Sequence, residues 1–180
     1  LAGIELEGIL NLGRISESLS KFTLGANATF MYTNVERSED QLKLEQPNPN
    51  FYSGNLRKRG LQGASPYTIN ADLKYETKTR SNFSRTFSLV YNVSGSKIYA
   101  VGTSGSDNFY EKPFHQLDFV YQEQLSKNWN VKAGVQNILN QKYKILLGDK
   151  SYYDVETNGI NTYTDYFRGI NFNLTVGYTF

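Results

Sequence analysis

The 180-residue sequence contains no cysteine and only one histidine, one tryptophan and one methionine. Without cysteine, thiol catalysis, disulfide bridges and cysteine-based zinc sites are excluded. The single histidine, His115, has no metal-ligand spacing around it, so we expect a structural residue at the start of a strand. No apolar run approaches the roughly 18 residues that a membrane-spanning helix needs, so no such helix is expected.

Neither the charge of the chain nor its motifs indicate a catalytic function. The chain has 19 basic and 17 acidic residues, a net charge of +2, which does not favour a nucleic-acid partner. We find no nucleophile–base pair, phosphate-binding glycine loop or nucleic-acid motif. The sequence therefore predicts a protein that is not an enzyme, with no catalytic residues, no metal site and no bound cofactor.

What the sequence does have is a regular alternation of apolar and polar residues. A period of two indicates strands with two different faces. In the last of these segments Ile170, Phe172, Leu174 and Val176 alternate with asparagine and threonine. The segments cover residues 4–12, 22–33, 67–76, 86–96, 115–124, 129–137 and 170–180. We predict an all-β fold, an antiparallel meander of about seven long strands.

The connections between these segments alternate in length. Short ones lie near residues 14–20, 78–84 and 125–128, whereas polar, glycine-rich and asparagine-rich ones span 37–65, 98–113 and 138–167. We expect the long ones to be loops. Short turns at one end and long loops at the other are typical of an outer-membrane barrel, as are strands of about 9–11 residues with aromatic ends. We therefore predict that the meander is part of a transmembrane β-barrel.

Three pieces of the chain resemble the C-terminal barrel segment of TonB-dependent outer-membrane receptors of the Bacteroidetes-like type. In "FHQLDFVYQEQLSKNWNVKAGVQNILNQKY" the ending N-I-L-N-x-x-Y is similar to the close of that family's penultimate hairpin. "LQGASPYTINADLKYE" resembles its G-x-S-P strand entry, and "FRGINFNLTVGYTF" its closing strand with a terminal aromatic residue.

The resemblance implies a barrel of about 22 strands with an N-terminal plug, which imports a scarce nutrient with energy delivered through TonB. The ligand class stays open among an iron chelate, a cobalamin-like cofactor and a glycan. Residues 1–180 are then the C-terminal portion of the barrel, in the outer membrane of a Gram-negative bacterium, without the plug and the TonB-contacting region. The implied partners are outer-membrane lipid, the barrel-assembly machinery, TonB through those absent regions, and a small nutrient ligand.

Three groups of residues are candidate sites. By the resemblance, the closing strand is a signal for the barrel-assembly machinery, carried by Leu174, Val176, Tyr178 and Phe180; the alternative is a set of lipid-facing interface residues. A tyrosine-rich loop offers a ligand-facing surface at Tyr152, Tyr153, Tyr163 and Tyr166, or else folds over its neighbours. A basic cluster offers anion contact at Arg57, Lys58 and Arg59, although a solvated loop apex is favoured there.

The charged residues of the strands are expected on the polar face, toward a barrel lumen. They are Glu5, Glu7, Asp72, Lys74, Glu76, Asp118 and Lys132. Two alternatives to the receptor stay open: a small outer-membrane barrel or adhesin without energised import, and a soluble β-sheet binding domain. The soluble alternative predicts the same alternation, but strands of soluble sheets are usually nearer 5–6 residues long.

Overall fold

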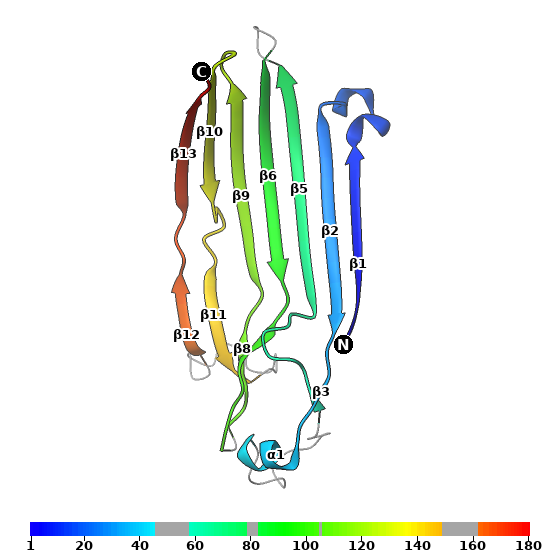
Figure 1. Cartoon of the computed structure of the whole chain (residues 1–180), viewed down its shortest axis with the longest axis vertical. Coiled ribbons are helices and arrows are strands. Elements are labelled where there is room, and N and C mark those ends of the chain that lie inside the picture. The colour runs from blue at the N-terminus through cyan, green and yellow to red at the C-terminus, as the bar shows by residue number, and fades with distance from the viewer. Residues whose placement is uncertain (46–57, 79–82, 105, 149–161) are drawn as a thin grey trace.

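The computed structural model describes residues 1–45, 58–78, 83–104, 106–148 and 162–180. Its main feature is a seven-stranded antiparallel sheet in which every strand pairs with its neighbours in chain order (Figure 1). The strands of this main sheet are β1 (Ala2–Asn11), β2 (Phe22–Tyr32), β5 (Tyr67–Lys78), β6 (Ser84–Ser94), β9 (Phe114–Gln124), β10 (Trp129–Gln136) and β13 (Asn171–Tyr178). All seven predicted strands and their meander order are confirmed, and β1 and β13 form the two edges.

Compact turns join the strands at one end of the main sheet, which we call the turn end. Between β1 and β2 lie two 3-10 turns, η1 (Leu12–Arg14) and η2 (Glu17–Leu19), where the Asn11 Oδ1 accepts a hydrogen bond from the Gly13 N–H at 2.9 Å. Between β9 and β10 the Leu125 N–H donates to the Trp129 carbonyl at 2.9 Å, and the Ser126 Oγ accepts from the Trp129 N–H at 3.2 Å. These side-chain contacts satisfy turn backbone groups that the ladder leaves unpaired.

At the opposite end the predicted long loops are wrong in part, because they contain regular structure. An extension sheet has the order β12-β11-β8-β7, formed by β7 (Lys97–Ala100), β8 (Phe109–Glu111), β11 (Lys142–Leu147) and β12 (Thr162–Phe167). A small hairpin pairs β3 (Val35–Glu36) with β4 (Lys58–Arg59). The extension forms because its apolar side chains, Ile98, Ile145 and Leu146, are buried there.

The extension sheet continues the main sheet after a break in each strand. The chain passes from β6 to β7, β8 to β9, β10 to β11 and β12 to β13, and each pair is separated by a short non-strand segment. Pro113, which has no N–H to donate to a ladder, lies in the break before β9. The buried cluster of Phe114, Tyr143 and Ile145, with Phe109 against it, packs beside these breaks.

One short helix, α1 (Glu39–Glu45), lies at the far end of the long connections (Figure 1). Ser38 and Gln41 form a capping box at its start. The Gln41 N–H donates to the Ser38 Oγ at 3.3 Å, and the Ser38 N–H donates to the Gln41 Oε1 at 3.1 Å. The described helices are all too short and too polar to cross a membrane.

Candidate functional site: a two-faced sheet

One face of the main sheet is apolar across every strand, and we call it the apolar face. Its central row contains one residue from each strand, directly paired across the sheet: Leu10, Leu24, Leu73, Leu89, Phe119, Val135 and Phe172. Several of these side chains are open to the surroundings, with exposed fractions of 39% for Leu24, 42% for Leu89 and 78% for Phe172. An exposed apolar surface of this extent marks contact with another protein or with a membrane.

An aromatic row lies next to this central row on the turn-end side. Phe22, Tyr75, Phe87 and Tyr121 are paired across four neighbouring strands. Their successive ring centroids lie 4.8, 6.0 and 5.1 Å apart, within the range of favourable aromatic contacts. Farther along the turn end, the Trp129 and Tyr178 ring centroids lie 4.8 Å apart in a tilted arrangement, and Tyr178 meets Phe180 edge-on at 5.2 Å.

The apolar side chains form a band that runs obliquely across the register. On successive strands from β2 to β13 the band covers residues 22–32, 67–75, 87–93, 117–121, 129–135 and 172–178. We count position along the strands in rows of directly paired residues. At the end near the long connections, the last apolar residue of the band is Tyr32 on β2 and Phe172 on β13. Phe172 lies four rows closer to the turn end than Tyr32, over five strand spacings. At the turn end, the last apolar residue of the band is Phe22 on β2 and Tyr178 on β13, and Tyr178 lies two rows farther in the same direction.

The size of this offset defines an angle between the band and the strands. Paired rows on one face are about 6.8 Å apart along a strand, and neighbouring strands are about 4.8 Å apart. An offset of two to four rows over five spacings therefore corresponds to a tilt of about 30–50°. If the band lies in a flat apolar layer, the strands cross that layer at about this angle from its normal.

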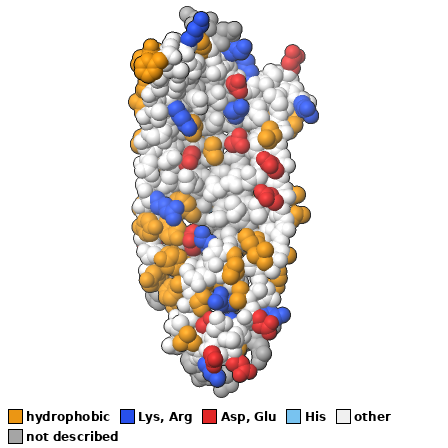
Figure 2. Space-filling model, in the orientation of Figure 1, with side chains coloured by type: hydrophobic (Ala, Val, Ile, Leu, Met, Phe, Trp, Pro, Cys, Tyr) orange, Lys and Arg blue, Asp and Glu red, His pale blue; other side chains and the backbone are white. Residues whose placement is uncertain are grey.

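The opposite face, which we call the polar face, carries amide, hydroxyl and charged side chains. The register places all seven of the charged residues predicted for it on this one side, as in the direct pairings of Glu7 with Asn27 and of Lys132 with Gln122. Figure 2 shows this face: acidic and basic side chains lie scattered over its upper part, and hydrophobic ones gather at its margins and lower part. The two faces therefore suit two different surroundings.

An asparagine row and two glycines give the polar face its local structure. The Asn70 Nδ2 donates to the Asn27 Oδ1 at 2.7 Å, and the Asn92 Nδ2 donates to the Asn70 Oδ1. Gly25 and Gly134 lie opposite larger polar side chains, where an added Cβ would collide with the Asp72 Oδ1 and would come within 2.7 Å of the Asn173 Oδ1. Glycine at these positions lets the opposing polar side chain lie across the neighbouring strand.

The predicted assembly residues lie on the β13 edge. Leu174, Val176 and Tyr178 are exposed on the apolar face, and Phe180 follows the strand with its side chain fully exposed. An exposed edge strand of this kind offers unpaired N–H and C=O groups to a further strand. Recognition of these residues by the assembly machinery stays a prediction.

The prediction that the tyrosine-rich segment is a loop is wrong for its last part, because Tyr163 and Tyr166 lie in the strand β12. Tyrosine and threonine favour strands, and β12 pairs with β11 along its length. The Tyr163 ring packs 4.7 Å from Phe109 and the Tyr166 ring 5.2 Å from Tyr143, although both residues remain exposed. Tyr152 and Tyr153 lie outside the described residues, and a ligand-facing role stays a prediction.

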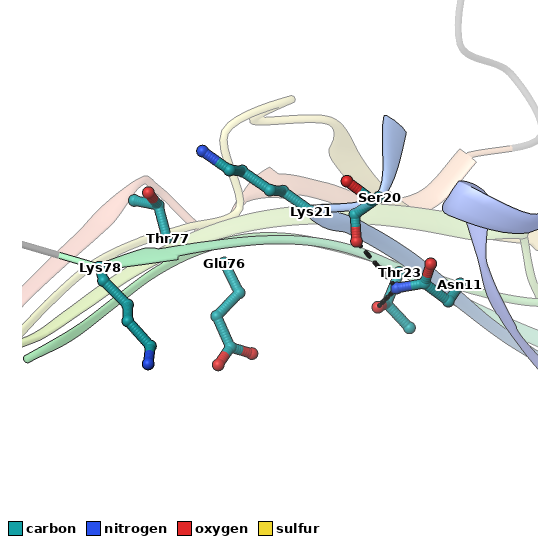
Figure 3. A pocket seen from close by; sticks show the side chains of 7 residues that line it. All are labelled: Asn11, Ser20, Lys21, Thr23, Glu76, Thr77 and Lys78. Carbon is teal, nitrogen blue, oxygen red and sulfur yellow. Dashed lines mark hydrogen bonds between the residues drawn. The ribbon is translucent and has the colours of Figure 1, made fainter. Parts of the chain in front are cut away.

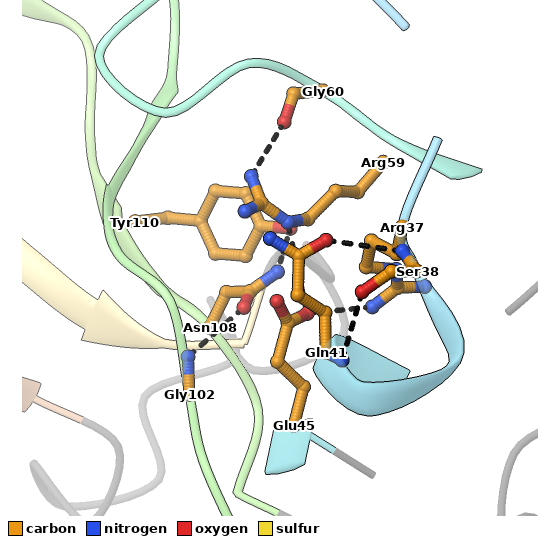
Figure 4. Close-up of polar contacts among 9 residues, drawn as sticks. All are labelled: Arg37, Ser38, Gln41, Glu45, Arg59, Gly60, Gly102, Asn108 and Tyr110. Atoms are coloured by element: carbon orange, nitrogen blue, oxygen red, sulfur yellow. Dashed lines mark hydrogen bonds and ion pairs between the residues drawn. The ribbon is translucent and has the colours of Figure 1, made fainter. Parts of the chain in front are cut away.

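The predicted basic cluster is divided by the fold. Lys58 and Arg59 form β4, in place of a loop apex, while Arg57 lies outside the described residues. Figure 4 shows Arg37, Glu45 and Arg59 together: the Glu45 Oε2 lies 2.8 Å from the Arg37 Nη1 and 3.6 Å from the Arg59 Nε. Arg59 is thus engaged with a buried carboxylate, whereas Lys58 is exposed. Anion contact by this cluster stays a prediction.

Two long connections meet beside this ion-pair cluster. The Ser104 N–H donates to the Leu44 carbonyl at 2.9 Å, and the Asn108 Oδ1 accepts from the Gly102 N–H at 3.0 Å beside it. The cavity between these groups measures about 30 Å³, enough for about one water molecule. We assign the cluster a structural role, because it fixes the end of α1 at Glu45, next to the Leu44 carbonyl that contacts the connection between β7 and β8.

A larger pocket of about 530 Å³ lies at the turn end between β2 and β5. Its lining side chains do not converge: in Figure 3 Glu76 and Lys78 point to one side of the sheet, whereas Thr77 and Lys21 point to the other. Across the described parts of the chain no cluster of three or more histidine, aspartate or glutamate residues is placed to hold a metal ion. The site that the fold builds is therefore the two-faced sheet itself.

Tyr143 at the junction of the two sheets has a strongly shifted pKa. Burial and a hydrogen bond with Glu111 raise the pKa of Tyr143 to about 12 from 10.0. The Arg168 guanidinium covers this cluster, 4.3 Å from the Tyr143 ring and 4.8 Å from the Phe114 ring. Arg168 thereby fixes the connection between β12 and β13 onto the buried cluster.

We predict a pH effect from Tyr143. Because the folded state holds the phenol proton more tightly than the unfolded state, this stabilisation is complete below pH 10 and is lost as the pH rises from 10 to about 12. In a titration followed by tyrosinate absorbance, Tyr143→Phe should remove a transition near pH 12. Tyr99→Phe, at an exposed position in β7, is the control and should leave that transition in place.

Comparison of the chain with family models, with curated proteins and with solved structures found no match. The assignment of a function therefore depends on the sequence pieces and on the geometry of the sheet.

Two groups of ion pairs in the structure were not predicted. The Arg37–Glu45–Arg59 cluster brings together residues from different parts of the connection between β2 and β5, and no sequence pattern indicates which of them meet. Arg85 and Glu123 are an ion pair on the apolar face, with the Arg85 Nη2 and the Glu123 Oε1 2.7 Å apart. A signal for this second pair is present in the sequence, because each residue occupies an apolar position of its strand's alternation.

Proposed function

We propose that this chain forms part of the wall of an outer-membrane β-barrel, with the apolar face against lipid and the polar face toward a hydrated lumen. The oblique apolar band carries this proposal. Strands of membrane barrels tilt by about 35–45° from the membrane normal, which lies within the tilt of about 30–50° that the band requires. A soluble sheet whose apolar face packs on a core has no requirement for an oblique band.

The length of the band on β2, where it is longest, supports the same proposal. From Phe22 to Tyr32 the band extends about 34 Å along β2 at about 3.4 Å per residue, and it is shorter on the other strands. At a tilt of about 40° this becomes about 26 Å along the normal, close to the roughly 25 Å apolar height of outer-membrane barrels. Trp129, Tyr178, Tyr32 and Tyr67 lie at the two limits of the band, where aromatic residues favour a membrane interface.

The two open edges suit a segment of a larger barrel. β1 and β13 each carry a row of unpaired backbone groups, which a bilayer does not tolerate. Further strands of the same barrel, paired on both edges, would satisfy these groups, and the exposed β13 would then be available to the assembly machinery. In this arrangement the turn end faces the periplasm and the extension sheet stands outside the cell.

We further propose that the barrel is a TonB-dependent receptor that imports a scarce nutrient. This step is supported by the three sequence pieces that resemble the family, and the ligand class stays open among an iron chelate, a cobalamin-like cofactor and a glycan. The test is uptake of labelled members of these three classes by cells with and without TonB and with and without the full-length protein. Uptake that is independent of TonB would favour a non-energised barrel.

The membrane arrangement predicts opposite surroundings for neighbouring residues of β6. Because residues 1–180 contain no cysteine, single cysteines introduced there are specific attachment points for a spin label once any cysteine elsewhere in the full-length protein is replaced by serine. In the full-length protein in bilayers, a label at Leu89→Cys should collide with dissolved oxygen, and one at Ser88→Cys should collide with a water-soluble nickel complex. Leu73→Cys and Lys74→Cys are paired directly with these positions on β5 and should repeat the contrast. Equal access of the nickel complex to both members of each pair contradicts the proposal.

A further inference from the structure

The apolar face carries one pair of charged side chains. Among the residues of the seven main-sheet strands, Arg85 and Glu123 are the only arginine, lysine, aspartate or glutamate residues at apolar-face positions. They are directly paired on β6 and β9, one row beyond Phe87 and Tyr121 toward the turn end. The pair therefore lies just outside the apolar band, on the side that the proposed function assigns to lipid.

The geometry of the pair leaves its positive member accessible. The Glu123 carboxylate accepts hydrogen bonds from the Arg85 Nη2 at 2.7 Å and from the Tyr121 hydroxyl, so both of its oxygens are occupied. Its side chain is 10% exposed, whereas the Arg85 side chain is 39% exposed. The surface that an approaching group meets is therefore a guanidinium whose orientation is fixed by the acid behind it.

Part of the Arg85 guanidinium remains available to a ligand. A guanidinium has five N–H bonds in a planar fork that matches phosphate oxygens. In the described part of the chain one of these bonds is used by Glu123, and the Nε–H is unpaired but buried, so the donors left for a ligand are the remaining N–H groups of the two terminal nitrogens. Thr77, opposite Arg85 on β5, adds a hydroxyl to the same row.

We propose that Arg85, held in place by Glu123 and Tyr121, binds the phosphate of a phospholipid headgroup in the leaflet at the turn end. This inference rests on the proposed function, because it needs the apolar face to lie against lipid. Just beyond the aromatic row, lipid acyl chains give way to headgroups, and a guanidinium at that level meets phosphate oxygens. The aromatic rings of Phe87 and Tyr121 would then contact the upper acyl chain of the same lipid.

The test measures phospholipid retained by the full-length protein. Wild type and variants are extracted in mild detergent, supplied with dioleoyl phosphatidylglycerol, and analysed by native mass spectrometry. Arg85→Gln should lower the fraction with bound phosphatidylglycerol about fivefold, the effect of one basic residue at a membrane surface. Glu123→Gln should not lower it, because the glutamine amide oxygen still accepts the hydrogen bond that orients the guanidinium, while the competing negative charge is removed. Dioleoylglycerol, which has the same acyl chains without phosphate, should bind equally to wild type and Arg85→Gln.

The control variant is Lys132→Gln, which removes a positive charge from the polar face near the same level of the sheet. It should leave phosphatidylglycerol retention unchanged. Equal retention by wild type and Arg85→Gln overturns the inference, and so does an equal loss in Lys132→Gln. The spin-label contrast at Leu89 and Ser88 separates the two proposals: if that contrast holds while Arg85→Gln has no effect, only the headgroup site is wrong.

Discussion

Ala71→Arg should destabilise the membrane-inserted protein by about 2–4 kcal/mol, the cost of an arginine on the lipid face near the bilayer midplane. Ala71 lies on the apolar face of β5, midway between Tyr67 and Tyr75 at the two limits of the band. Its direct partners are Ala26 on β2 and Tyr91 on β6. Because alanine contributes little packing, the change isolates the cost of placing a charge in the band. The measurement is reversible urea unfolding of the full-length protein in phospholipid vesicles.

The matched control is Thr68→Arg on the same strand. Thr68 lies on the polar face between Thr29 and Ser94, where an arginine would stay hydrated. The free energy of unfolding of the Thr68→Arg variant should differ from that of wild type by less than about 0.5 kcal/mol, as for surface substitutions in general. If this face of the sheet were open to water, Ala71, which is only partly buried, would accept an arginine at a cost similar to that at Thr68. Equal effects of the two substitutions would therefore contradict a lipid-facing position.

The alternation of residues was sufficient to predict the main sheet, because each strand has one apolar and one polar side and its period is local. The seven predicted segments match β1, β2, β5, β6, β9, β10 and β13. The extension sheet was not predictable in this way, since β7 and β8 are only four and three residues long. Such segments are too short to show a period, and Ile98 and Phe109 become buried only when distant connections meet.

The sequence was sufficient to predict that the sheet has an apolar face and a polar face, but not that the apolar residues form an oblique band. Assigning Leu89 and Ser88 to opposite faces needs only the sequence, whereas the oblique course of the band needs the register between strands. Register depends on hairpin geometry, which sets which residues are directly opposite. The same limit applies to Arg85 and Glu123: each residue breaks its own strand's pattern, but only the pairing of β6 with β9 shows that the two charges meet.

The asparagine residues that follow β10 are explained by the left-handed backbone conformation of this segment. Asn137 and Asn140 have φ values of 57° and 42°, in a region that asparagine adopts more readily than branched residues. Asn137 is 4% exposed; its N–H donates to the Asp118 Oδ1 at 2.8 Å and its Nδ2 to the Gly169 carbonyl at 2.7 Å. Asn137 therefore ends β10 and ties this break to the one between β12 and β13.

Two substitutions separate these roles of Asn137. Asn137→Gly keeps the left-handed backbone accessible but loses the bond to Gly169, so it should lower the free energy of unfolding by about 1 kcal/mol. Asn137→Val loses the same bond and adds the strain of a branched residue in the left-handed region, roughly 1–2 kcal/mol more. The total of about 2–3 kcal/mol should appear in urea unfolding, with faster hydrogen exchange in β11 and β12. If valine and glycine have equal effects, the positive φ is not what places asparagine there; if glycine has no effect, the bond to Gly169 does not hold the two breaks together.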